Sequence, residues 1–167
     1  MNLKNILLLL SLLALASCTS ESRSVEYYDL TIKSSSEKSL SNIQVTTTGP
    51  SRQRMLFLDG VNVEVLEFNR WLDEPERLLE NKLKVYFRGT EGGPVLNVEL
   101  LRFNYDAGQQ RCEFSMTCEL KSRTAEKSHA YRFDLEKAEV NNDPEDVALA
   151  MSGLVEQAFA ELAEQLR

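Results

Sequence analysis

The chain has 167 residues, the size of one domain, and a net charge of −7 from 19 basic and 26 acidic residues. An acidic chain without clustered lysine and arginine is a poor binder of nucleic acid, because such clusters are needed to neutralise phosphates. We therefore expect no nucleic acid among its partners.

The first 17 residues have the form of a secretory signal peptide. Lys4 precedes an apolar run over residues 6–16, and a basic start, a short apolar stretch and small residues at a cleavage site are typical of export. A helix that spans a membrane needs roughly 20 apolar residues, so this run is too short. It ends in Leu15-Ala16-Ser17-Cys18, which resembles the lipobox of bacterial lipoproteins. The alternative is an ordinary signal peptide with an incidental cysteine.

The lipobox resemblance implies that Cys18 is lipidated. In bacterial lipoproteins the cysteine thiol receives a diacylglyceryl group, cleavage follows between the residues matching Ser17 and Cys18, and the new N-terminus is acylated. Several acyl chains give lasting attachment, whereas one chain gives only reversible binding at about 0.8 kcal/mol per methylene. Thr19 follows the cysteine, where aspartate usually retains Gram-negative lipoproteins in the inner membrane. The resemblance thus implies the periplasmic face of the outer membrane.

Cleavage leaves an acidic body. It removes Lys4 and no acidic residue, so 18 basic and 26 acidic residues remain. We expect residues 18–24 to form an acylated tether and residues 25–167 to form one domain. Because the body is acidic, the acyl chains rather than its surface charge should hold it at a membrane.

The first half of the body predicts mainly strands, from short alternating and β-branched runs. We expect strands at residues 26–33 and 42–48, a loop at 34–39, a turn at Gly49-Pro50, a run buried on both sides at 55–58, and a hairpin through Asp59-Gly60 into 61–68.

A short central helix follows Trp71. Asp73 and Glu76 fit a capping box, and Pro75 fits the first helical turn. The buried stripe of this helix should comprise Leu78, Leu79 and Leu83. Trp71 should pack between the preceding strand and this helix, with a binding hot spot as the alternative. Residues 85–87 should then re-enter the sheet.

The second half predicts a three-stranded meander over residues 95–105, 110–121 and 129–136, followed by a capped helix from Asn142-Asp143-Pro144 to the C-terminus. An apolar stripe with a 3.6-residue period should pack this helix on the sheet; it comprises Val147, Met151, Leu154, Ala158, Phe159, Leu162 and Leu166. The predicted fold is α+β, with a mostly antiparallel sheet and one short and one long helix.

Cys112 and Cys118 lie six residues apart on one alternating strand. That spacing separates them by roughly 20 Å, whereas a disulfide needs Cα atoms within about 7 Å. We expect both to be small buried apolar groups, although an oxidising compartment would permit a disulfide.

Residues for catalysis or metal binding are scarce. His129 is the only histidine, and its place in a strand beside Tyr131 predicts a partly buried structural role. Once Cys18 is acylated, the chain lacks four cysteine or histidine ligands for a structural zinc, and it contains no glycine-rich phosphate loop. We expect no catalytic residue, no metal and no cofactor.

Four segments resemble the ABC-type transport auxiliary lipoproteins, typified by the paraquat-inducible protein C group. The segments are Tyr27-Tyr28-Asp29-Leu30, Phe68-Asn69-Arg70-Trp71-Leu72-Asp73-Glu74-Pro75, residues 95–103, and the end of the last helix at residues 160–166. The segment from Trp71 to Pro75 is the most specific of them, and the resemblance covers residues 25–167.

This resemblance implies a function that the residues alone do not. Members accompany transporters built from a mammalian-cell-entry (MCE) domain protein, often with a permease and an ATPase, which move lipids across the envelope. The lipoprotein docks the periplasmic end of that assembly without catalysis, and some relatives form homo-oligomeric rings. Two alternatives stay open: an assembly factor for another outer-membrane complex, and a lipid-anchored binder of a hydrophobic ligand.

Overall fold

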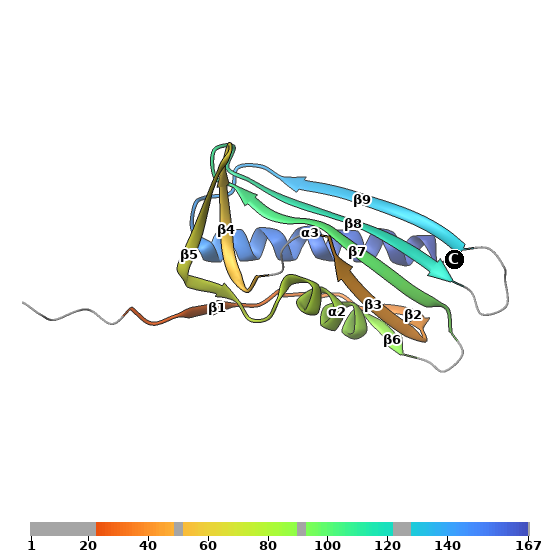
Figure 1. Ribbon diagram of the computed structural model, residues 1–167. Helices are drawn as coiled ribbons and strands as arrows, with labels where there is room; N and C mark the ends of the chain where they lie inside the picture. The colour runs from red at the N-terminus through yellow and green to blue at the C-terminus, as the bar shows by residue number, and fades with distance from the viewer. Residues whose placement is uncertain (1–22, 49–51, 90–92, 122–127, 167) are drawn as a thin grey trace, which may run out of the picture.

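The computed structural model describes residues 23–48, 52–89, 93–121 and 128–166. Ser17 and Cys18, the turn at Gly49-Pro50 and the connection at residues 122–127 lie outside the described residues. The strands in those ranges are β1 (Glu26–Tyr28), β2 (Ser36–Leu40), β3 (Asn42–Thr47), β4 (Arg54–Asp59), β5 (Asn62–Trp71), β6 (Phe87–Gly89), β7 (Val95–Asp106), β8 (Arg111–Lys121) and β9 (Ser128–Lys137), and the helices are α2 (Pro75–Tyr86) and α3 (Pro144–Gln165) (Figure 1).

Seven strands form one sheet in the order β1-β5-β4-β7-β8-β9, with β3 also paired to β7. The meander β7-β8-β9 is antiparallel, as is the pair β4–β5. The pairs β1–β5 and β3–β7 are parallel, and β2 and β6 form a separate two-stranded parallel sheet. The structure therefore has the predicted α+β fold with a mostly antiparallel sheet.

The long helix α3 runs lengthwise beneath the meander (Figure 1). Pro144 occupies its first turn, and the Asp143 carboxylate accepts a hydrogen bond of 2.8 Å from the Glu145 backbone N–H, so the predicted cap is confirmed. The predicted stripe is also confirmed, because its members from Val147 to Leu162 are buried against the strands and Leu166 packs at the margin of the core.

The helix α2 buries the predicted leucines together with Tyr86. Its predicted capping box is wrong. The helix begins at Pro75, and its N-cap is Glu74, whose side chain makes no capping hydrogen bond. The Asp73 carboxylate instead accepts a hydrogen bond of 2.9 Å from the backbone N–H of Glu74. Residues 85 and 86 are the last turn of α2 and do not re-enter the sheet, because the buried Tyr86 ring packs edge-on against Phe159 of α3.

The predicted strand at residues 26–33 is also wrong beyond Tyr28. The Thr31 N–H donates to the Ser152 hydroxyl at 3.0 Å, and the N–H groups of Lys33 and Ser34 donate to the Glu156 carboxylate at 3.1 and 2.7 Å. These helix side chains take the place of a neighbouring strand. We call this set of contacts between α3 and residues 31–34 the α3 clamp.

Two further predictions in the first half need correction. Residues 36–40 are not a loop but β2, because β6 offers them a parallel partner. Residues 55–58 are not buried on both sides: Met55 and Phe57 face the core, whereas Leu56 and Leu58 are half-buried on the opposite face.

The hairpin from β4 to β5 is confirmed, with Gly60 in the left-handed region at φ 59°. Val61 in its turn and Val63 on β5 are 98% and 56% exposed. Within the described residues, no helix is long and apolar enough to cross a membrane.

Candidate functional site

Trp71 and Pro75 lie on either side of the junction between β5 and α2. The Trp71 ring is 5% exposed and packs edge-on against Phe103 of β7, with 4.9 Å between ring centroids. Trp71 and Pro75 line one hollow of about 100 Å³ together with Leu56, Leu101 and Phe103. We call it the Trp71 hollow; it brings together two residues that the sequence singles out.

Three arginines lie beside this hollow on the side of β4 and β5. Arg52 and Arg54 line the Trp71 hollow and also, with Arg70, an adjoining open hollow of about 380 Å³. Arg54 of β4 and Arg70 of β5 are direct cross-strand partners, so their side chains lie on the same face of the sheet. Sequence reasoning found no basic cluster, because Arg70 is distant from Arg52 and Arg54 in the chain and only the hairpin brings it beside them.

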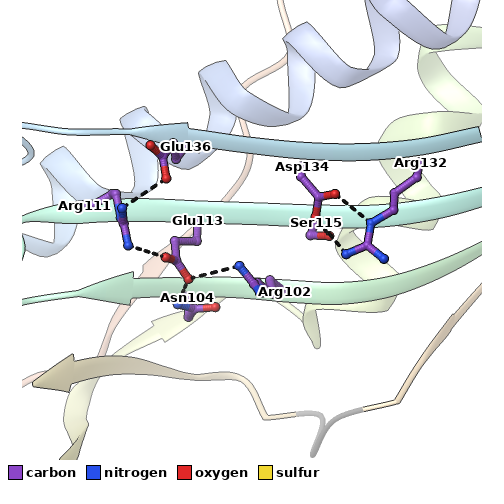
Figure 2. Close-up of polar contacts among 8 residues, drawn as sticks. All are labelled: Arg102, Asn104, Arg111, Glu113, Ser115, Arg132, Asp134 and Glu136. Atoms are coloured by element: carbon purple, nitrogen blue, oxygen red, sulfur yellow. Dashed lines mark hydrogen bonds and ion pairs between the residues drawn. The ribbon is translucent and has the colours of Figure 1, made fainter. Parts of the chain in front are cut away.

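The outer face of the meander carries a network of ion pairs (Figure 2). At its centre the Glu113 carboxylate accepts hydrogen bonds from Arg111 at 2.8 Å and Asn104 at 3.1 Å, with Arg102 at 4.0 Å. Arg111 also pairs with Glu136 of β9 at 3.1 Å. These contacts cross-link three strands, and they leave Glu113 occupied by donors rather than free to act as a base.

A second group in Figure 2 joins β8 to β9. The Ser115 hydroxyl donates to Asp134 at 2.5 Å, and the Arg132 guanidinium donates to both oxygens of the same carboxylate at 2.6 and 3.2 Å. The hydrogen bonds from Arg132, then that from Ser115, lower the pKa of Asp134 to about 2. Ser115 is 2% exposed, and its hydroxyl is committed to Asp134. The sequence showed only an alternating strand here.

We expect Asp134 to stabilise the fold above about pH 4 and to lose that effect toward pH 2. Its pKa falls from 3.8 to about 2 in the folded protein, so protonation favours the unfolded state across that interval. The melting temperature of the wild type should exceed that of Asp134→Asn at pH 7, and the difference should shrink as the pH falls below 4. A difference that stays constant with pH would contradict the assignment.

Cys112 and Cys118 are free and buried under the meander, as the sequence predicts. Burial raises the pKa of each thiol to about 12, so neither forms a thiolate at neutral pH. The prediction for His129 is wrong: this residue is exposed near the start of β9, the last strand of the sheet. The described part of the chain contains no group of three or more histidine, cysteine, aspartate or glutamate residues placed to hold a metal ion.

No protein-family model matches the chain. No curated protein matches it in sequence either. Solved structures do match. A crystal structure of an uncharacterized protein has a TM-score of 0.71 and 16% identity, covering 86% of this chain and 99% of the other. Protein XCC0632 from Xanthomonas campestris, described under the family model DUF330, has a TM-score of 0.66 and 15% identity, covering 82% and 92% of the two chains.

These similarities define the class of fold to which the chain belongs. Nearly the whole length of both solved proteins is matched, so the α+β arrangement is shared as a complete domain. At 15–16% identity the similarity extends to the fold alone.

Proposed function

We propose that this protein is a lipid-anchored docking component of an MCE-type lipid transport assembly, held on the periplasmic face of the outer membrane. The observation that carries the proposal is the sequence resemblance to the ABC-type transport auxiliary lipoproteins, in which Leu15-Ala16-Ser17-Cys18 precedes one domain with the segment from Trp71 to Pro75. A partner role, rather than catalysis, follows from that resemblance.

The short tether supports a docking role close to the membrane. β1 begins eight positions after Cys18, and an extended residue spans at most about 3.6 Å, so the body lies within about 30 Å of the acylated cysteine. A partner that binds the body is thereby held at the membrane surface.

An open edge of β5 supplies a surface for such a partner. β1 pairs only with Asn69–Trp71, so within the described residues β5 has no neighbouring strand on that side over residues 62–68. Val63 and Phe68 on this stretch are 56% and 37% exposed. Unpaired backbone groups beside apolar side chains are a template for another strand. The MCE-domain protein, or a second copy of the chain in a ring, is the proposed occupant.

The test is affinity purification of the full-length protein from envelopes in mild detergent after crosslinking. We expect an MCE-domain protein to co-purify, together with the permease and ATPase of its system. Val63→Lys should reduce that recovery, because it places a charge on the open edge. Val85→Lys is the matched control, since Val85 is 75% exposed on α2.

Recovery of a different outer-membrane complex, without any MCE-domain protein, would replace this proposal with the assembly-factor alternative. The Trp71 hollow bears on the ligand-binding alternative. Its volume of about 100 Å³ is well below the roughly 300–1,000 Å³ of sites that enclose small molecules. The adjoining hollow of about 380 Å³ is open and lined by polar and charged residues, so neither hollow suits enclosure of a lipid tail.

A further inference from the structure

The arginines beside the Trp71 hollow form an island of positive charge on an acidic protein. Arg54 and Arg70 stand directly opposite each other on β4 and β5. Like charges in that position destabilise a sheet. Arg52, on the chain just before β4, adds a third cation to the same open hollow. The arrangement therefore weakens the fold unless an anion relieves the repulsion.

Two carboxylates lie near these arginines, Glu76 in the lining of the Trp71 hollow and Glu74 in the lining of the open hollow. Glu74 lies 3.7 Å from Arg77, on the first turn of α2. The Nε of Arg70 is buried and has no hydrogen-bond partner among the described residues. A buried donor without an acceptor is rare in a folded protein and costs stability.

A third side chain lies in the same row across the sheet as Arg54 and Arg70. Tyr27 of β1 is the cross-strand partner of Arg70, so Tyr27, Arg70 and Arg54 share one face. Tyr27 is 55% exposed, which leaves its hydroxyl accessible. Planar guanidinium groups match the oxygens of a phosphate in pairs, and several of them around one hollow favour a phosphate over a single-charge anion.

We propose that Arg52, Arg54 and Arg70 bind a phosphate group, carried either by a lipid headgroup or by a small soluble phosphate. The site rests on the geometry of the body and not on the proposed docking role. The adjoining Trp71 hollow, at about 100 Å³, accommodates the glycerol end of a ligand rather than its acyl chains. The phosphate replaces the missing acceptor at Arg70 and offsets the repulsion between Arg54 and Arg70.

The chain carries its own reporter for a binding experiment. Trp71 is the only tryptophan and lines the hollow that Arg52 and Arg54 border. The full-length protein in a non-ionic detergent is titrated with inorganic phosphate and with glycerol 3-phosphate at constant ionic strength, against chloride and acetate. In a second arm the detergent micelles contain phosphatidylglycerol, against diacylglycerol, which has similar acyl chains and no phosphate.

We expect a saturable change in Trp71 fluorescence with the phosphate probes and none with chloride, acetate or diacylglycerol. Arg54→Gln should weaken binding by about tenfold or more, since a hydrogen bond to a charged group is lost. The same variant should raise the melting temperature without ligand, because it removes the repulsion with Arg70. A purely structural role for Arg54 predicts the opposite shift.

Arg88→Gln is the matched control, because Arg88 is an exposed arginine in β6, at the other end of α2. It should bind the probes as the wild type does. A response to soluble phosphates alone would assign the site to small phosphates, whereas a response to phosphatidylglycerol alone would assign it to lipid headgroups. No saturable response to any phosphate probe, an unchanged response in Arg54→Gln, or an equal response to acetate would overturn the proposal. An equal response to acetate would point to an acidic peptide instead.

Discussion

Replacing Trp71 with alanine is expected to lower the free energy of unfolding by about 3–5 kcal/mol, the usual cost of removing a buried tryptophan. The ring is 5% exposed and packs against Phe103 at 4.9 Å, so its removal leaves a cavity between β5, β7 and α2. Urea unfolding followed by circular dichroism measures the change, because the variant has no tryptophan fluorescence.

Leu72→Ala is the control for that experiment. Leu72 is the next residue and is 55% exposed, so its truncation should change stability by no more than about 0.5 kcal/mol. If Trp71→Ala left stability within that range and instead abolished recovery of a partner protein, Trp71 would be an interface residue rather than a core residue.

Replacing Cys18 with serine is expected to abolish lipidation completely. Serine has no thiol to receive the diacylglyceryl group, so labelled palmitate should not be incorporated and the protein should accumulate as an unprocessed precursor or in a soluble form. Labelling and fractionation of envelopes measure both effects. Unchanged labelling in Cys18→Ser would show that the resemblance at Leu15-Ala16-Ser17-Cys18 is incidental.

Thr19 offers a matched pair of variants for the same experiment. Thr19→Ser should leave lipidation and the outer-membrane fraction unchanged, because it keeps a small hydroxyl side chain. Thr19→Asp should keep the label but move the protein to the inner membrane, as the lipoprotein resemblance implies. An inner-membrane location for the wild type would contradict the localisation proposed above.

The elements that sequence analysis predicts well are those with one long face toward the core. In α3 the apolar residues recur every 3.6 positions behind a strong N-cap at Asp143, and the apolar residues of β8 alternate from Cys112 to Leu120. A local pattern of that length specifies both the element and its buried side, which is also why Cys112 and Cys118 are correctly placed.

The errors occur where partners distant in the chain decide the structure. Residues 31–34 follow a strand pattern, but they are hydrogen-bonded to Ser152 and Glu156 of α3, which lie more than a hundred positions later in the sequence. The short strand β2 exists only because β6 lies beside it. Strand register likewise decides two other features, the hollow lined by Arg54 and Arg70 and the ion pairs of Figure 2. No local sequence pattern encodes that register.

The α3 clamp determines how the body carries a mechanical load applied at its N-terminus. A pull on the tether is borne first by the three residue pairs between β1 and β5. Beyond them, the bonds from residues 31–34 pass the force into the side of α3, the longest helix of the core. These bonds must break before a pull can draw out the chain beyond Ser34. The clamp should therefore make the domain resist being unravelled from its N-terminal end.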